Sequence, residues 1–143
     1  MRAVDRARRR RLALAAGIVA FASAGYALHQ DAVRARRFEA VSALVRTSLD
    51  VERYFERHGE YPRDIVALRG PGPADRAASG AASHYTLQLV SPNPATNARA
   101  SYLLIATPTG GQIGDACGRY TFDERAHHAN PDASVAAEAC WPR

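Results

Sequence analysis

The sequence contains no lysine, and all nineteen of its permanently cationic side chains are arginines. It also lacks a charge surplus outside its first eleven residues. Those residues hold six arginines against one acid, so the rest of the chain carries thirteen arginines and thirteen acids. A protein that follows a nucleic-acid backbone needs a basic patch. The net charge of +5 therefore belongs to the N-terminus, and no nucleic-acid partner is expected.

The sequence also lacks the motifs of common enzyme chemistry. There is no G-x-S-x-G and no H-E-x-x-H, and the Gly-rich segment 110–114 has no Lys-Ser/Thr to hold a phosphate. His127 and His128 are adjacent, unlike the spaced ligands of a metal site, so we interpret them as part of a solvated loop. Cys117 and His127 could form a nucleophile and base only if the cysteine were unpaired. We therefore expect no enzyme activity, cofactor, metal or small-molecule substrate.

One apolar segment, Leu12 to Leu28, has seventeen residues without a charge. That length is at the short end of the roughly 17–25 residues of a membrane-spanning helix. The arginines before it should stay in the cytoplasm. We expect a basic cytoplasmic tag at 1–11, a single inner-membrane span at 12–28 and a periplasmic domain at 29–143. The alternative is signal-peptidase cleavage after Ala24, which would release a secreted, soluble binding module.

A helical pattern continues beyond the apolar segment. From Asp31 the sequence has no Gly or Pro until Gly59, so one helix is expected from about Leu12 to His58, ended by Gly59 and Pro62. Apolar residues recur there at steps of three and four, with Ser48 on the same line and Leu49 at its margin. The predicted packing face consists of Val41, Leu44, Val45, Val51 and Phe55.

Three strand-like runs follow, at 84–90, 101–107 and 118–124, after a Pro/Gly-rich loop at 69–83. A short edge strand is expected around 134–136. The connections are short, which favours antiparallel pairing. A small sheet of this kind must bury one face, and the amphipathic half of the helix is the available partner. The predicted fold class is therefore α+β.

The two cysteines, Cys117 and Cys140, are the only ones in the chain. A disulfide between them suits an exported protein, because disulfides persist outside the cytoplasm. Two unpaired thiols in a cytosolic protein are the alternative.

Two regions resemble the type IV pilins, in particular the minor-pilin (PilE-like) branch. In 26–62 the resemblance is carried by Tyr26, Gln30, Asp31, Val33, Arg34, Arg36, Arg37, Glu39, Ala40, Ser42 to Leu44, Glu52 to Tyr54 and Gly59 to Pro62. In 101–141 it is carried by Tyr102 to Pro108, Asp115 to Gly118, Thr121 to Asp123, Cys140 and Trp141.

The resemblance implies a pilin-like fold. Its long N-terminal helix has a membrane half and an amphipathic half, the latter packed on a small antiparallel sheet with a C-terminal disulfide loop. It also implies a subunit or accessory protein of type IV pilus assembly, which contacts other pilins or pilus assembly proteins through the helix and the sheet edge. Expected locations are the inner membrane, with the N-terminus cytoplasmic and the C-terminal domain periplasmic, and the pilus fibre.

The chain departs from the family at its start. Family members have a leader ending in Gly, followed by Phe-Thr-Leu-Ile-Glu. Alignment on Gln30 and Asp31 places Asp5 at the Gly position and Arg10 at the Glu position. We therefore expect a pilin-like chain without the usual prepilin cleavage motif. Entry into the fibre as a minor subunit and retention in the membrane as an accessory both stay open.

Overall fold

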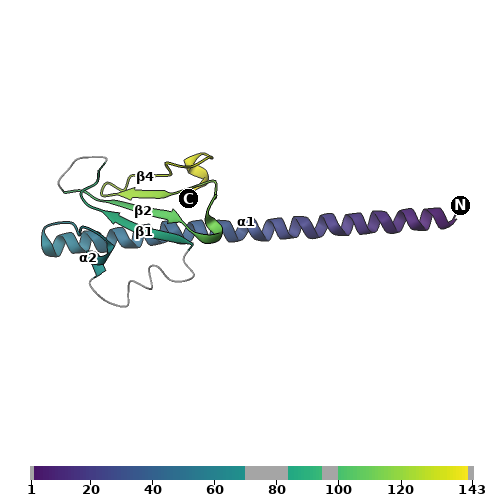
Figure 1. Cartoon of the computed structure of the whole chain (residues 1–143), viewed down its shortest axis with the longest axis horizontal. Helices are drawn as coiled ribbons and strands as arrows, with labels where there is room; N and C mark the ends of the chain where they lie inside the picture. The colour runs from purple at the N-terminus through teal and green to yellow at the C-terminus, as the bar shows by residue number, and fades with distance from the viewer. Residues whose placement is uncertain (1, 70–83, 95–99, 142–143) are drawn as a thin grey trace. The chain divides into compact units, whose positions relative to one another are not determined.

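The computed structural model describes residues 2–69, 84–94 and 100–141 (Figure 1). For residues 2–16, 18–20 and 69 it describes the backbone only. The chain divides into two compact units, Met1–Ala35 and Arg36–Arg143. The second unit contains the sheet and the core.

Helix α1 runs from Arg2 to His58. It begins ten residues before the expected start near Leu12, because the Arg- and Ala-rich segment before Leu12 also favours helix. Its predicted end is confirmed. Gly59 adopts a positive φ of 74°, and its N–H donates to the Phe55 carbonyl oxygen at 2.8 Å. A glycine in this left-handed conformation is the usual way to close a helix.

A second, short helix follows the long one. Helix α2 (Ile65–Arg69) has five residues. The Asp64 carboxylate accepts the N–H of Ala67 at 2.7 Å, which satisfies one of the free donors at the helix start. The expected Pro/Gly-rich loop at 69–83 falls almost entirely outside the described residues.

The sheet has four antiparallel strands in sequential order: β1 (Tyr85–Val90), β2 (Leu103–Pro108), β3 (Tyr120–Asp123) and β4 (His128–Ala129). Pairing is in register from Tyr85 opposite Pro108 to Val90 opposite Leu103, and β3 pairs with β2 with Ala106 opposite Tyr120. The three predicted strands are confirmed, as is the antiparallel arrangement. Strands β1 and β3 are shorter than predicted, and β2 begins two residues later and ends one residue later.

The fourth strand corrects the sequence prediction. It was expected around 134–136, but it lies at His128–Ala129. The reason is a tight turn after β3, in which the Asp123 carboxylate accepts the N–H groups of Arg125 and His127. This turn brings β4 back to pair with β3 at once. Residues 134–136 instead follow a bent path, held where the Ser134 N–H donates to the Ala116 carbonyl oxygen at 2.9 Å.

The core of the second unit lies between α1 and one face of the sheet. Leu44 and Val51 of the helix are fully buried, as are Leu104, Ala106 and Tyr120 of the sheet. Strands β1 and β2 alternate buried and more exposed positions, as expected for a sheet with one covered face. The sequence prediction of an α+β fold, with a long helix packed on a small antiparallel sheet, is confirmed.

The packing face of α1 differs from the prediction at its margin. Val41 lies in the core with Leu44 and Val51, and Phe55 is half-buried with its ring 4.5 Å from that of Tyr61. The prediction for Val45 is wrong, because its side chain is 42% exposed. Additional buried helix positions are Ala40, Thr47 and Ser48, while Leu49 is 53% exposed. The helix therefore turns the 40–44–47–51 line toward the sheet, and Val45 and Leu49 lie to one side of it.

Within the part of the chain that the structure describes, no helix has an apolar stretch sufficient to cross a membrane. Within the predicted span at 12–28, the side chains of 12–16 and 18–20 are outside the described residues.

Candidate functional site

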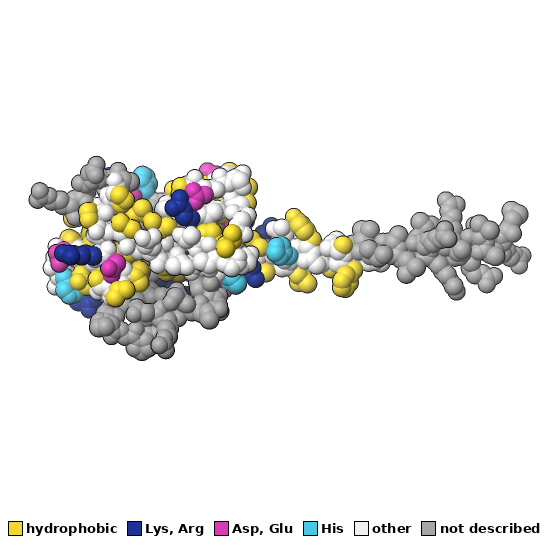
Figure 2. Space-filling view, viewed as in Figure 1, with side chains coloured by type: hydrophobic (Ala, Val, Ile, Leu, Met, Phe, Trp, Pro, Cys, Tyr) yellow, Lys and Arg dark blue, Asp and Glu magenta, His cyan; other side chains and the backbone are white. Residues whose placement is uncertain are grey.

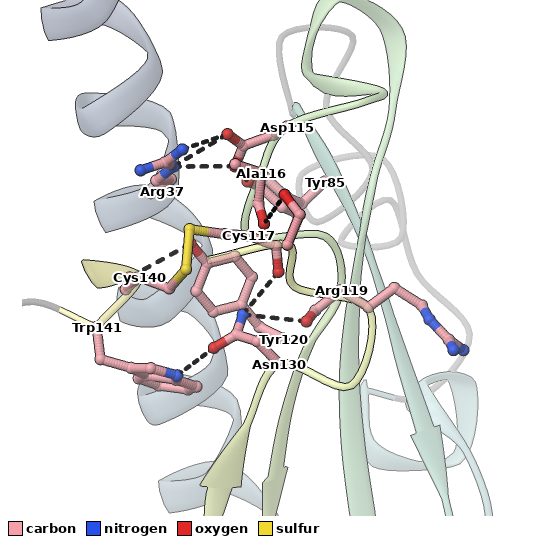
Figure 3. Close-up of a disulfide and its surroundings, with 11 residues drawn as sticks. Arg37, Tyr85, Asp115, Ala116, Cys117, Arg119, Tyr120, Asn130, Cys140 and Trp141 are labelled. Carbon is pink, nitrogen blue, oxygen red and sulfur yellow. Dashed lines mark hydrogen bonds and ion pairs between the residues drawn. A yellow bond between two sulfur atoms is a disulfide. The ribbon is translucent and has the colours of Figure 1, made fainter. Parts of the chain in front are cut away.

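A disulfide closes the C-terminal region of the second unit. Cys117 and Cys140 are bonded, with their Cα atoms 5.6 Å apart, and both are buried (Figure 3). The pairing implied by the pilin resemblance is confirmed. The loop that it closes contains β3, β4 and the short 3-10 helix η2 (Ala137–Ala139). The disulfide thus links the segment just before β3 to the C-terminal end of the chain.

A polar and aromatic cluster surrounds this disulfide (Figure 3). The Asn130 side-chain amide donates to the carbonyl oxygens of Cys117 at 3.0 Å and Arg119 at 3.1 Å. The Trp141 indole N–H donates to the Asn130 side-chain oxygen. The Trp141 ring also meets Tyr120 edge-on, with centroids 5.4 Å apart. These contacts immobilise the segment that follows β4.

Tyr120 lies at the centre of the cluster. Its hydroxyl donates to the Cys140 carbonyl oxygen at 3.3 Å, and its ring meets Tyr85 edge-on at 5.7 Å. Burial raises the pKa of Tyr120 well above its ordinary value. The phenol therefore stays neutral and serves as a donor within the core.

An ion pair joins α1 to the loop after β2. The Arg37 guanidinium holds the Asp115 carboxylate through two nitrogens, with Nε to Oδ2 at 2.9 Å, and the Asp115 side chain is only 5% exposed. Burial alone would raise the pKa of Asp115, but the hydrogen bond and charge of Arg37 outweigh it and lower that pKa. The Tyr85 hydroxyl also reaches the carboxylate, at 3.5 Å. Sequence reasoning did not find this pair, because the two residues are 78 positions apart.

The exposed side of α1 carries large apolar residues. Phe38 is 59% exposed, Val45 42% and Leu49 53%. Their steps of seven and four place them along one line of the helix, as in the apolar seam of helices that pair. We call Phe38, Val45 and Leu49 the helix stripe. In the first unit, Phe21 and Leu28 are also exposed, and Figure 2 shows hydrophobic side chains along the described part of the helix.

The described residues offer little to a metal or a substrate. None of them form a group of three or more His, Cys, Asp or Glu side chains suited to a metal ion. His127 is exposed and lies 3.9 Å from the Asp123 carboxylate. A hollow of about 360 Å³ is lined by Phe55, Tyr61 and Arg63, among others. Its lining also includes Ser91, whose hydroxyl donates to the Ser101 carbonyl oxygen at 3.0 Å.

The long helix, the four-stranded antiparallel sheet and the C-terminal disulfide define a pilin. The family model of the type IV minor pilin ComP, DNA uptake sequence receptor, matches residues 28–121. The chain belongs to this family of type IV minor pilins.

A solved structure supports the fold. The chain is similar to a type IV pilin from Shewanella oneidensis, at 24% sequence identity and a TM-score of 0.52. The match covers 78% of this chain and 99% of the other. No curated protein compared with the chain matches it.

The comparisons bear on the expected function at a coarse level. They indicate a role in a type IV pilus, and the family and the fold are structural rather than enzymatic. The family description also names a DNA uptake sequence receptor. A DNA ligand in the family runs against the expectation that the chain has no nucleic-acid partner.

Proposed function

We propose that this chain is a membrane-anchored subunit or accessory protein of a type IV pilus, and that its helix stripe docks against the helix of another pilin. The exposure of Phe38, Val45 and Leu49 carries this proposal. Soluble helices that pack on a sheet keep their outer face polar. Three large apolar residues on one line of the outer face favour a helical partner.

The energetics favour helix pairing along this line. A Val, Leu or Phe side chain contributes about 1.5–3 kcal/mol when it is moved fully from water into an apolar contact. The helix stripe is narrow, which suits a seam between two helices better than a broad sheet. Of the two edge strands of the sheet, β4 is only two residues long and β1 has α2 beside it, so both edges provide a weaker docking element.

The anchor is the second part of the proposal. Residues 12–28 would span the inner membrane, 1–11 would stay in the cytoplasm, and 29–143 would form the periplasmic domain. The uncharged length of 12–28 and the arginines before it support this arrangement. The disulfide agrees with a domain outside the cytoplasm. The alternative is a soluble module released after Ala24, and mass spectrometry of the mature N-terminus distinguishes the two.

A double substitution tests the docking surface. Val45→Asp together with Leu49→Asp adds charge to the helix stripe without touching the core. We expect loss of surface pili, or of pilus-dependent twitching motility, in cells that still accumulate the folded variant. Val66→Asp is the matched control, because Val66 is 56% exposed but lies on α2. Normal piliation with the double variant would refute docking through the helix stripe.

DNA binding is a second candidate function, supported by the description of the matched family. The exposed arginines Arg46, Arg57 and Arg63 of the periplasmic domain could contact phosphates. Such binding must weaken steeply as salt rises, because each phosphate contact releases counterions. Gel retardation of double-stranded DNA at increasing salt tests it. Absence of retardation at low salt would reject this candidate and leave the pilus role untouched.

A further inference from the structure

The loop between β2 and β3 ends in an exposed apolar tip. Residues 109–114, Thr-Gly-Gly-Gln-Ile-Gly, carry no charge, and Ile113 is 73% exposed. The neighbouring Gln112 is buried, so the loop is fixed to the domain and Ile113 points away from it. Gly114 has a positive φ of 84°, which lets the chain turn sharply directly after Ile113. The tip is therefore held in place by its flanks.

This tip lies at the start of the second unit, beside the first helical residues of that unit. Asp115, at the end of the loop, is bound by Arg37 (Figure 3). A Cβ atom on Gly111 would be 3.7 Å from a guanidinium nitrogen of Arg36. The negative charge of Asp115 is neutralised by Arg37, so the loop and its surroundings offer an apolar tip and the cation of Arg36.

The chain limits how far this tip can be from the proposed membrane span. Only eight residues, 29–36, lead from the end of the span at Leu28 to Arg36. Eight helical residues rise about 12 Å. The polar zone of a bilayer extends roughly 5–8 Å beyond the hydrocarbon on each side. The Arg36 backbone therefore lies about 4–7 Å beyond this polar zone at most. The long Arg36 side chain, next to which the loop lies, can close that gap.

We propose that the β2–β3 loop rests on the outer surface of the bilayer, with Ile113 in the interfacial zone and Arg36 beside the phosphates of anionic phospholipids. This inference depends on the proposed membrane anchor. One isoleucine alone would bind a membrane weakly. Because the anchor makes the contact intramolecular, a weak contact suffices to orient the periplasmic domain. The partner is the lipid surface, since the tether holds the tip at that surface.

Single-cysteine probes in the full chain test the proposal. Both native cysteines are in the disulfide, so an environment-sensitive fluorophore reacts only with an introduced thiol. The variants are Ile113→Cys, Val66→Cys on α2 as the exposed control, and Phe21→Cys within the proposed span. Each is reconstituted as one chain per nanodisc, in mixed phosphatidylcholine and phosphatidylglycerol. Quenching by a spin-labelled lipid near the headgroup depth is measured.

The expected result is strong quenching at Phe21→Cys and quenching at Ile113→Cys several-fold greater than at Val66→Cys. Adding Arg36→Gln should reduce quenching at Ile113→Cys in the anionic discs but not in pure phosphatidylcholine. Equal quenching at 113 and 66, with position 21 quenched, would overturn the loop contact and leave the anchor standing. No quenching at position 21 would overturn the anchor and the contact with it. A parallel preparation with two chains per disc completes the test. Shielding of position 113 only in that preparation would overturn the lipid contact and assign the tip to a second copy.

Discussion

Arg37 of α1 and Asp115 of the loop after β2 form an ion pair in which the carboxylate is almost completely shielded from water. The two side chains are 78 residues apart in the sequence. The pair ties the helix to the sheet at the end of the domain where the helix begins to pack. Its geometry joins α1, the β2–β3 loop and, through Tyr85, the first strand.

Removal of the Asp115 charge should destabilise the domain. Asp115→Asn leaves the Arg37 guanidinium without its anion, and we expect a loss of about 1–3 kcal/mol in the free energy of unfolding. Chemical denaturation of the full chain in detergent micelles measures it. Asp31→Asn is the matched control, because Asp31 and its partner Arg34 are both 75% exposed and 4.0 Å apart. That variant should change stability by less than about 0.5 kcal/mol. Equal losses of stability in the two variants would contradict the idea that burial strengthens the Arg37–Asp115 pair.

The same pair predicts how stability depends on acid. The pKa of Asp115 is lowered in the folded state by Arg37, so its contribution is fully present above the unfolded-state pKa of about 4. It is lost as the pH falls through the lower pKa of the folded state. We expect the unfolding free energy to decline below about pH 4, and Asp115→Asn to flatten this decline. Denaturation midpoints, measured for both proteins from pH 7 down to well below about pH 4, test this expectation. An unchanged acid slope in the variant would refute the assignment.

Loss of the disulfide should weaken the C-terminal half of the sheet. The bond joins residues 23 positions apart, and a loop of this size is worth about 3–4 kcal/mol. Cys117→Ser together with Cys140→Ser should lower the thermal midpoint and release Trp141, which a change in tryptophan fluorescence reports. A reductant should reproduce the effect in the native chain and leave the double variant unchanged. A response of the double variant to reductant would show that the effect does not come from this bond.

Among the glycines that the structure describes in the second unit, Gly118 should be the least replaceable. It has a φ of 57°, and a Cβ atom there would be 2.9 Å from the Asp132 Cβ. Gly118→Ala therefore adds a steric clash to the backbone cost of about 1–2 kcal/mol for the left-handed conformation. Gly114→Ala is the control, because its φ of 84° is positive but open space surrounds it. Thermal unfolding should rank Gly118→Ala as clearly worse, and equal losses would argue against the contact with Asp132.

At Ala126, by contrast, a substitution to glycine should stabilise the domain. It is a non-glycine residue with a φ of 59°, in the turn between β3 and β4. Ala126→Gly removes the side-chain strain of this conformation and should raise the unfolding free energy by up to about 1 kcal/mol. The gain should appear as a higher thermal midpoint. A lower midpoint would mean that the entropy of the added glycine outweighs the relief of strain.

The C-terminal boundary of the long helix and the three main strands were predictable because their causes are local. The segment before Gly59 has no helix breaker from Asp31 onward, and Gly59 itself can adopt the positive φ that closes the helix. Runs rich in Tyr, Thr, Val and Ile, bounded by turn residues, favour strands. The pilin resemblance implied the disulfide, and the chain has only two cysteines that could form it.

The sequence by itself determined where the chain is helical and where most of it is extended, because these preferences depend on near neighbours. Only the tertiary structure decided that Val45 and Leu49 face outward, since helical periodicity indicates the centre of the apolar face but not where its margin leaves the sheet. It also decided that Arg37 meets Asp115. A contact between residues so far apart depends on how the whole chain closes, and no short stretch of sequence contains that information.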